Sequence, residues 1–381
     1  MTNNSEFDQI RPFNDDEVST KIAQLCEVPY FSRVLTFLYP GQPIEAVMAK
    51  LKTIRTIDQF QSEFVIPFLT NLIKNTTDGV TASGLENISD SKSYLFVSNH
   101  RDIILDSALL NYKLHEHGIN TTEIAIGDNL LIYEWITDLV KLNKSFVVKR
   151  NLPVRQMMEA SATLSAFIRN AIVNSHQNIW IAQREGRSKD GDDQTQTSVL
   201  KMFNLSGSED TIQNFKELNI TPVSISYEFD PCDYLKAYQF QLKRDDPNYQ
   251  KSQREDLTHM STGLNGRKGR IHFSFGQPIG SELNALEGMN KNAQIQSLAD
   301  LIDKQIHLNY HLWPGNYVAF DTLNSTSQFA DRYTADERDI FFEYVNEHIS
   351  RIEAPDEDFI MKMILMMYAN PVTNRIKAEN S

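Results

Sequence analysis

The chain has 381 residues, of which 41% are hydrophobic and 23% charged, so it can bury a sizeable core and is not expected to be disordered. Its formal net charge of -13 argues against nucleic acid as a partner, because binding phosphates requires a basic surface. The two cysteines, Cys26 and Cys232, are too few for a disulfide framework or a thiolate zinc site, and they suit a reducing cytoplasm. No run of about 18 apolar residues occurs, so no membrane-spanning helix is expected.

The first part of the chain has a helical pattern. Asn14-Asp15-Asp16-Glu17 is typical of a helix start, and apolar residues then recur at helical spacing as far as residue 77, with a break at Tyr39-Pro40-Gly41. We therefore predict an N-terminal helical segment over residues 1–79.

From residue 80, short apolar runs alternate with helical patterns, which is typical of a layered α/β domain. The predicted strands are 94–97, 146–148, 179–182, 222–227 and 271–275. The predicted helices between them are 105–117, 154–174 and 199–217. Residues 230–268 are polar and charged, and we interpret them as a long excursion.

After Pro278 the pattern is helical again, over 292–310, 334–352 and 355–370. The predicted organisation is an α/β domain at 80–285, with a layered sheet and flanking helices, followed by a C-terminal helical segment at 286–381. The most apolar stretches, 64–73 and 359–369, favour core helices, with a peripheral membrane contact as the alternative.

One stretch raises a chemical question: residues 97–106, VSNHRDIILD, place a histidine between a predicted strand and a helix. His100 could be a solvated loop residue, a core residue or a general base. A histidine base at neutral pH needs a second group that orients the imidazole and stabilises its cation. Asp102 and Asp106 are the two candidates for that group.

Three further polar stretches, 143–150, 183–191 and 221–228, also adjoin predicted strands, and each alone could be an ordinary loop. Polar residues at the ends of strands in an α/β fold often form the site. The four stretches together combine a base, an acid and several cations, a set that suits transfer of a group onto a hydroxyl near a phosphate. The candidate phosphate ligands are Lys149, Arg150, Arg187 and Lys189.

A protein kinase can be excluded although His100-Arg101-Asp102 spells HRD. The kinase loop needs an asparagine five residues after the aspartate, and this chain has Ser107 there. It also has no glycine-rich strand upstream and no DFG downstream.

The four stretches, in this order, resemble the four motifs of the glycerolipid acyltransferases, which include the glycerol-3-phosphate and lysophosphatidate acyltransferases. Asn99-His100 with Asp106 resembles the first motif, and Phe146 to Arg150 the second. Glu185-Gly186 with Arg187-Ser188 resembles the third, and Pro222-Val223 with Tyr227 the fourth. The resemblance covers roughly residues 80–280 and points to a divergent, bacterial-type branch.

The first motif departs from the family, because five residues rather than four separate His100 from Asp106. A helix turns about 100° per residue, so Asp106 can reach His100 only if residues bulge out before the helix begins. We favour Asp106 over Asp102, because the apolar residues that follow Asp106 keep the family's helix. The third motif is also one residue shorter than usual, and Lys144 stands where a glycine is common.

The resemblance implies that His100 deprotonates an acceptor hydroxyl, with Asp106 orienting it. It implies that Arg150 and Arg187, with Lys149, hold the acceptor's phosphate, and that Glu185, Gly186 and Ser188 help to position the acceptor. The acyl group would come from acyl-CoA or acyl carrier protein, the acceptor would be glycerol 3-phosphate or a lysophospholipid, and no metal or cofactor is implied.

A local reversal of charge supports an acidic acceptor, since residues 141–155 carry five basic residues and no acid. We expect these residues, Lys141, Lys144, Lys149, Arg150 and Arg155, to form a basic lip over the site or, alternatively, an ordinary solvated face. The expected protein is cytoplasmic, or peripheral on the inner face of the membrane.

Two other classes remain as alternatives. A lipid-binding protein that kept the fold without catalysis would explain the altered spacing. An esterase would need a nucleophile, but no GxSxG occurs. We expect the other histidines His115, His117, His176 and His272 to be structural or solvated.

Overall fold

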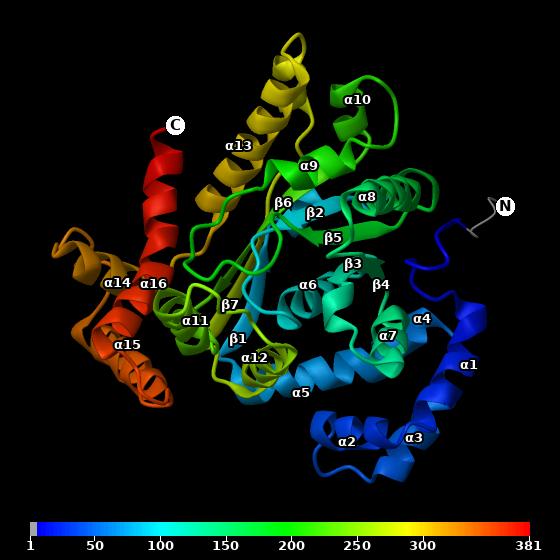
Figure 1. Cartoon of the computed structure of the whole chain (residues 1–381), viewed down its shortest axis with the longest axis horizontal. Helices are drawn as coiled ribbons and strands as arrows, with labels where there is room; N and C mark the ends of the chain where they lie inside the picture. Colours follow the sequence, from blue (N-terminus) through cyan, green and yellow to red (C-terminus); the bar gives the residue numbers. More distant parts are fainter. Residues whose placement is uncertain (1–5) are drawn as a thin grey trace.

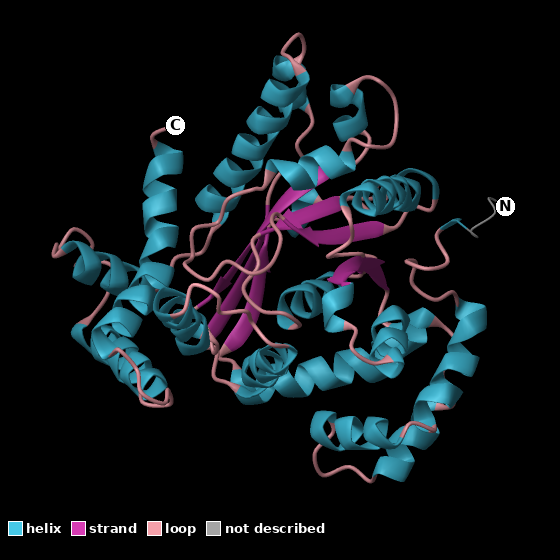
Figure 2. Ribbon diagram, viewed as in Figure 1, coloured by secondary structure: helices cyan, strands magenta, loops and turns pink. Residues whose placement is uncertain are grey.

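The computed structural model describes residues 6–381, so the first five residues of the predicted N-terminal segment lie outside the description. A seven-stranded mixed sheet forms the centre, and helices cover both of its faces (Figures 1 and 2). The α/β prediction with flanking helices is therefore confirmed. The strands are β1 (Gly79–Ser83), β2 (Leu95–Ser98), β3 (Thr122–Gly127), β4 (Ser145–Val148), β5 (Asn178–Ala182), β6 (Ile220–Tyr227) and β7 (Arg270–Phe275).

The strand order is β1-β7-β6-β2-β5-β3-β4, and every neighbouring pair is parallel except β6 and β7. The five strands β6, β2, β5, β3 and β4 therefore run in one direction. Their carboxyl ends meet at one edge of the sheet, where the loops that follow them can build a common site.

The two faces of the sheet pack against different helices because side chains alternate along each strand. On β2, Leu95 and Val97 join the core under α8, α9 and α13, whereas Phe96 joins the core under α5 and α6. The helices next to the sheet are α6 (Leu105–Glu116), α7 (Glu134–Leu142), α8 (Val154–Arg169), α9 (Thr197–Phe203), α10 (Thr211–Lys216) and α13 (Lys291–Asn309). A π-helical turn, Asn170–Asn174, extends α8. Short 3-10 turns occur at Leu85–Asn87, Asp128–Leu130 and Ser281–Leu286.

The N-terminal helices form a layer beside α7 with an apolar core of its own, which includes Phe31, Leu35 and Phe60 (Figure 1). A π-helical turn, Gln61–Val65, joins α4 to α5 (Ile66–Thr76), and Pro67 follows directly after this turn, where the helical hydrogen-bond pattern is already interrupted. The helices are α1 (Asp15–Cys26), α2 (Pro29–Leu38), α3 (Ile44–Leu51), α4 (Ile57–Phe60) and α5 (Ile66–Thr76).

The C-terminal helices pack against α11 (Asp233–Asp245), one of two helices that the sequence prediction missed. The long excursion predicted at residues 230–268 contains both of them, α11 and α12 (Gln253–Asn265). Phe229 and Ala237 join the apolar core of the C-terminal helices, so α11 connects these helices to the sheet. Those helices are α14 (Pro314–Asn324), α15 (Ala335–Ile349) and α16 (Glu357–Glu379).

The other elements bear out part of the sequence interpretation and correct the rest. All five predicted strands are present, but β1, β3, α7 and α14 were not predicted. The predicted helix 199–217 is two helices, α9 and α10, because residues 204–210 leave the helical conformation. The division into three segments stays a prediction.

Gly191 allows the loop after β5 to approach α16. Its φ is +75°, and a Cβ at this position would collide with the backbone carbonyl of Met367. We expect Gly191→Ala to lower the free energy of unfolding by roughly 1–3 kcal/mol more than Gly118→Ala. Gly118 is a matched control because it has a similar φ, +70°, and open space around its Cα. Urea unfolding of both variants would measure the difference, and equal losses would show that the contact with α16 is unimportant.

Candidate active site

The loop between β2 and α6 carries His100 and is anchored to the neighbouring strand β6. The Asn99 side chain donates to the carbonyl of Ile225 at 2.9 Å and accepts from the N–H of the same residue at 2.8 Å. Asn99 and Ile225 are both fully buried. The asparagine before His100 therefore continues the sheet's hydrogen bonding with its side chain and fixes where the loop leaves β2.

His100 and Asp106 are in direct contact. His100 Nδ1 lies 2.7 Å from Asp106 Oδ2, and that oxygen also accepts from the backbone N–H groups of Arg101 at 2.6 Å and Asp102 at 3.1 Å. The hydroxyl of Tyr227 on β6 donates to Asp106 Oδ1 at 2.9 Å. Because α6 begins only at Leu105, the loop before it absorbs the additional residue of the first motif, and the acid still reaches the histidine.

The environment of Asp106 keeps its carboxylate ionised. Burial opposes the charge, but the hydrogen bond from His100 and the two backbone N–H donors outweigh burial, so the pKa of Asp106 lies below its usual value. Burial, with the negative charge of Asp106 as the next cause, raises the pKa of Tyr227 well above its usual value, so Tyr227 remains a hydroxyl donor. A buried anion fully supplied with donors is suited to orient an imidazole.

Asp102 has a different role in this structure. Its Oδ1 accepts from the backbone N–H groups of Ile104 at 2.9 Å and Leu105 at 2.8 Å, so it caps the start of α6. Gly263 of α12 passes so close to Asp102 that a Cβ there would collide with the carboxylate. Burial and the nearby charge of Asp106 raise the pKa of Asp102. Asp102 thus joins the loop to α6 and α12, while Asp106 contacts the histidine.

The ring of His100 rests on Trp180 of β5, with the ring centroids 5.6 Å apart in an edge-to-face arrangement. Trp180 Nε1 donates to Ser98 Oγ at 3.0 Å, and the N–H of Ser188 donates to the carbonyl of His100 at 3.1 Å. Trp180 therefore supports the imidazole ring, and Ser188 fixes the backbone of His100. Its side chain keeps 14% exposure, which leaves it accessible from the cavity above it.

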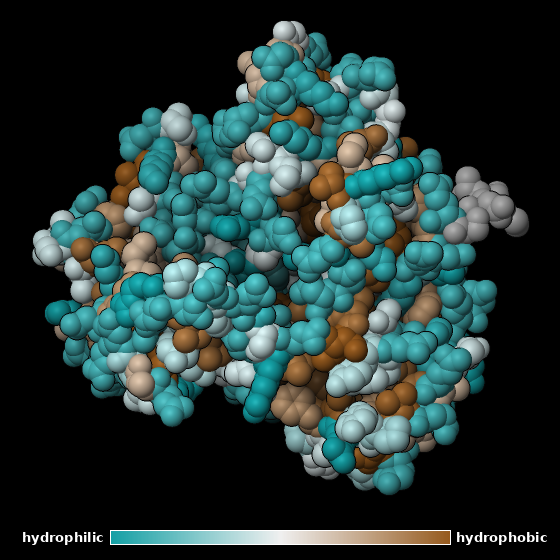
Figure 3. Space-filling view, viewed as in Figure 1, coloured by the Kyte–Doolittle hydropathy of each residue, from teal (hydrophilic) through white to brown (hydrophobic). Residues whose placement is uncertain are grey.

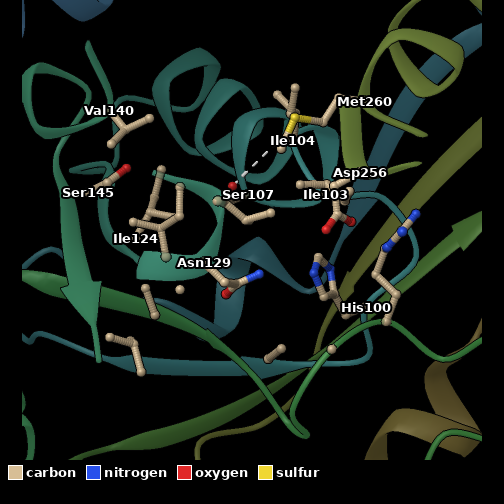
Figure 4. A pocket seen from close by; sticks show the side chains of 18 of the residues that line it. His100, Ile103, Ile104, Ser107, Ile124, Asn129, Val140, Ser145, Asp256 and Met260 are labelled. Carbon is tan, nitrogen blue, oxygen red and sulfur yellow. Dashed lines mark hydrogen bonds between the residues drawn. The ribbon is translucent and has the colours of Figure 1, made fainter. Parts of the chain in front are cut away.

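His100 lines a cavity of about 1190 Å³. Figure 4 shows His100 on one side of it, near Asp256 and Met260 of α12, and Val140 and Ser145 on the opposite side. Much of the lining away from His100 is apolar and comes from α2, α5, β3, α7 and α8. On the outer surface, hydrophobic side chains gather over α5 and α7 (Figure 3).

The predicted phosphate ligands line the same cavity. Arg150 follows β4, and its Nη1 lies 3.1 Å from Glu185 Oε1 in the loop after β5. Arg187 Nη1 lies 3.3 Å from Nδ1 of His259 on α12. The exposed Lys149 and Gly186, which has a φ of +72°, complete this part of the lining. The second and third motifs therefore meet the first at the carboxyl edge of the sheet.

Two sequence expectations need correction. Ser188 is buried and does not line the cavity, because its hydroxyl donates to Asp190 Oδ1 at 3.2 Å inside the loop. The expected basic lip over residues 141–155 is divided: Lys141 is buried, and Lys144 donates to Thr121 at 3.0 Å. Only Lys149 and Arg150 of that set reach the cavity.

The structure also reveals supporting residues that the sequence did not single out. Arg101 forms a buried, bidentate ion pair with Asp193, with N–O distances of 2.7 and 2.5 Å. The fully buried Lys236 of α11 donates to the carbonyl of Arg101 at 2.8 Å and pairs with Asp230. Buried charged residues therefore hold both the side chain and the backbone carbonyl of Arg101, the residue after His100. A lone Asp or Lys in a polar stretch gives no sequence signal for such a contact.

Residues 6–381 contain neither a cluster of metal-binding side chains nor a helix suited to span a membrane. No group of three or more His, Cys, Asp or Glu side chains is placed to hold a metal ion. No helix there combines the length and the hydropathy needed to cross a bilayer.

Comparison with known proteins agrees with the motifs. Residues 79–226 match the model of the family described as Acyltransferase. This segment contains β1 to β5, nearly all of β6 and most of the residues of the four motifs, so the resemblance to the glycerolipid acyltransferases is confirmed for residues 79–226.

Comparisons of the whole chain with individual proteins are less informative than the match to the family model. No curated protein matches the chain. Among solved structures, the chain is similar to the crystal structure of the 1-acyl-sn-glycerophosphate (LPA) acyltransferase PlsC from Thermotoga maritima, at 13% identity and a TM-score of 0.37. That likeness covers 75% of this chain and 91% of the other.

Proposed function

We propose that the protein is an O-acyltransferase. It moves a fatty acyl group from an acyl thioester, acyl-CoA or acyl carrier protein, to a hydroxyl of glycerol 3-phosphate or a lysophospholipid. The observation that carries this proposal is the pair of His100 and the buried Asp106 at the wall of a large, partly apolar cavity. The match of residues 79–226 to the Acyltransferase family supports it.

The proposed reaction follows from the tautomer of His100. Because Asp106 accepts from Nδ1–H, the neutral ring keeps an electron pair on Nε2. Nε2 takes the proton of the acceptor hydroxyl as its oxygen attacks the thioester carbonyl, and the resulting imidazolium is stabilised by the Asp106 carboxylate. The carbon–sulfur bond then breaks, and the proton on Nε2 passes to the leaving thiolate, so that ester and thiol are released.

The apolar part of the cavity supports an acyl chain as the transferred group. Residues Ile124, Leu139 and Val140 line it, and Val140 lies on the side opposite His100 (Figure 4). An extended chain whose carbonyl is at His100 could place its methyl end there. Burying the chain releases roughly 0.8 kcal/mol per methylene, which favours long-chain donors.

This placement predicts a change in chain-length preference. Val140→Trp fills the far end of the cavity, so we expect kcat/KM for palmitoyl-CoA to fall about tenfold relative to that for butyryl-CoA. The short donor is the internal control, because it does not reach Val140 and should report any loss of folding. Equal losses for the two donors would place the acyl chain elsewhere.

Cations near His100 support an acidic acceptor. In this proposal Arg150 and Arg187, with Lys149, hold the phosphate, while Glu185 and Gly186 position the acceptor. The ion pair between Arg150 and Glu185 limits how the guanidinium can turn. A cytoplasmic setting and a peripheral contact with the inner face of the membrane remain predictions.

A non-catalytic protein that binds acyl lipids is the second candidate, for which the large, partly apolar cavity is the supporting observation. The test is thiol release from palmitoyl-CoA with a panel of acceptors: glycerol 3-phosphate, lysophosphatidate, a lysophospholipid with a larger headgroup, and glycerol. Acceptor-dependent release supports the acyltransferase. If neither acyl-CoA nor acyl carrier protein donors gave thiol release, and acyl-CoA still bound saturably, the result would support the binding protein instead. Release that is equal without acceptor would indicate hydrolysis.

A further inference from the structure

Three lysines that the proposed reaction does not use line the same cavity as His100. Lys189 lies in the loop after β5, Lys243 in the last turn of α11, and Lys251 in the connection from α11 to α12. Two of the three therefore come from residues 230–268, the polar region for which the sequence suggested no function. We call Lys189, Lys243 and Lys251 the lysine cluster.

The charges of the lysine cluster are only partly neutralised. Among residues 6–381, the side chains of Lys189 and Lys243 form no hydrogen bond and no ion pair, whereas Lys251 pairs with Asp256 of α12. Burial, followed by the positive charges of Lys243 and Lys251, lowers the pKa of Lys189 to about 8. Like charges held together in this way disfavour one another until an anion binds between them.

A neighbouring histidine, His259, does not change the charge of this side of the cavity. Burial, followed by the charges of Arg187 and Lys251, lowers the pKa of His259 to about 2, so the ring is neutral. Its Nδ1 lies 3.3 Å from Arg187, which makes no other side-chain hydrogen bond within the described chain. Arg187 and the lysine cluster together outnumber the carboxylates of Asp190 and Asp256, which also line the cavity, so the balance of charge here is positive in a chain whose net charge is -13.

We propose that the lysine cluster binds phosphoryl groups of a substrate, and that its occupant is the phosphorylated nucleotide end of a coenzyme A donor. This inference rests on the proposed acyltransferase function. An acyl-CoA carries, in order, an apolar chain, a thioester and several phosphates. The cavity has Val140 on its apolar side and His100 opposite, near Asp256 of α12 (Figure 4). The lysine cluster also lines the cavity, and Lys251 pairs with Asp256, which places this lysine near the His100 side.

The number of cations favours the donor over the acceptor. Three lysines suit the several phosphates of a nucleotide handle, whereas glycerol 3-phosphate carries one phosphate, for which Arg150 and Arg187 already stand beside the cavity. Donor and acceptor both carry phosphate, so the experiment must distinguish the binding of coenzyme A from the binding of glycerol 3-phosphate.

Isothermal titration with coenzyme A and with glycerol 3-phosphate as separate probes tests the proposal without requiring turnover. We expect Lys243→Ala and Lys189→Met each to weaken coenzyme A binding about tenfold, since each removes one charge-assisted contact. Glycerol 3-phosphate binding should change much less. Lys362→Ala is the matched control, because Lys362 is an exposed lysine on α16 that does not line the cavity.

A pH series supplies a second readout that a purely structural role would not produce. The groups that act on Lys189 are Arg187 on its own loop, Lys236 and Lys243 on α11, and Lys251, which is paired with Asp256. As pH rises through about 8, Lys189 loses its proton, and coenzyme A binding by the wild type should weaken. Lys189→Arg keeps its charge and should retain binding at higher pH.

The possible results lead to different conclusions. Weaker coenzyme A binding in both variants, with charge-retaining Lys243→Arg near wild type, supports the proposal. Weaker binding of glycerol 3-phosphate alone would overturn the assignment to the donor and move the site to the acceptor. Unchanged binding of both probes would overturn the phosphate site altogether. The proposed acyltransferase function would survive that last result if acceptor-dependent thiol release still depended on His100.

Discussion

His100→Ala is expected to lower acceptor-dependent thiol release by about 10²–10⁴-fold, because the variant has no group to take the hydroxyl proton as the thioester is attacked. The loss should appear in kcat, with a smaller change in KM, since the imidazole is proposed to act on the proton rather than to hold the acceptor. The measurement is steady-state thiol release from palmitoyl-CoA with the acceptor that the wild type prefers.

The control for this prediction must separate chemistry from folding. His100 is partly exposed and makes one side-chain hydrogen bond, so its removal should leave circular dichroism and thermal unfolding close to those of the wild type. His115→Ala is the matched variant, because His115 is an exposed histidine near the end of α6 and does not line the cavity. If folded His100→Ala kept wild-type turnover, the proposed base would be excluded.

The sequence predicted the sheet where strands are buried on both faces and failed where they are not. β2 and β6 are buried throughout; β2 continues an apolar run and β6 has apolar residues at alternate positions, so both could be predicted. β1 is an edge strand of half-exposed and exposed residues, GVTAS, and lacks such a run. α11 was missed because it buries polar residues such as Asp233, Lys236 and Gln239, and therefore shows no apolar periodicity.

The candidate site was predictable as far as local motifs extend. His100, Arg150 and Arg187 stand next to strand ends, and parallel strands bring such ends together. The contact of Tyr227 with Asp106 spans 121 residues and depends on the register of β2 against β6, which no local pattern encodes. Lys243 and Lys251 reach the cavity only because α11 and α12 fold back over it.

The two acids of the first motif have different partners: Asp106 contacts His100, whereas Asp102 binds backbone N–H groups at the start of α6. Asp106→Asn is expected to lower kcat by about 10²–10⁴-fold while the protein stays folded. The amide oxygen can still accept from His100 Nδ1 and the two backbone N–H groups, and the amide nitrogen can donate to the hydroxyl oxygen of Tyr227. The negative charge that stabilises the imidazolium is lost, and that charge is what the reaction requires.

Asp102→Asn is the matched control, with the same change of atom and charge four residues earlier. Asparagine caps helices about as well as aspartate, so its oxygen should keep the hydrogen bonds from Ile104 and Leu105, and kcat should fall by about threefold or less. Both variants would be compared by kcat, KM and thermal unfolding. A severe loss in Asp102→Asn with an active Asp106→Asn would transfer the role of partner to Asp102. Equal, mild effects in both would mean that His100 needs no carboxylate, and the proposed mechanism would lose its second residue.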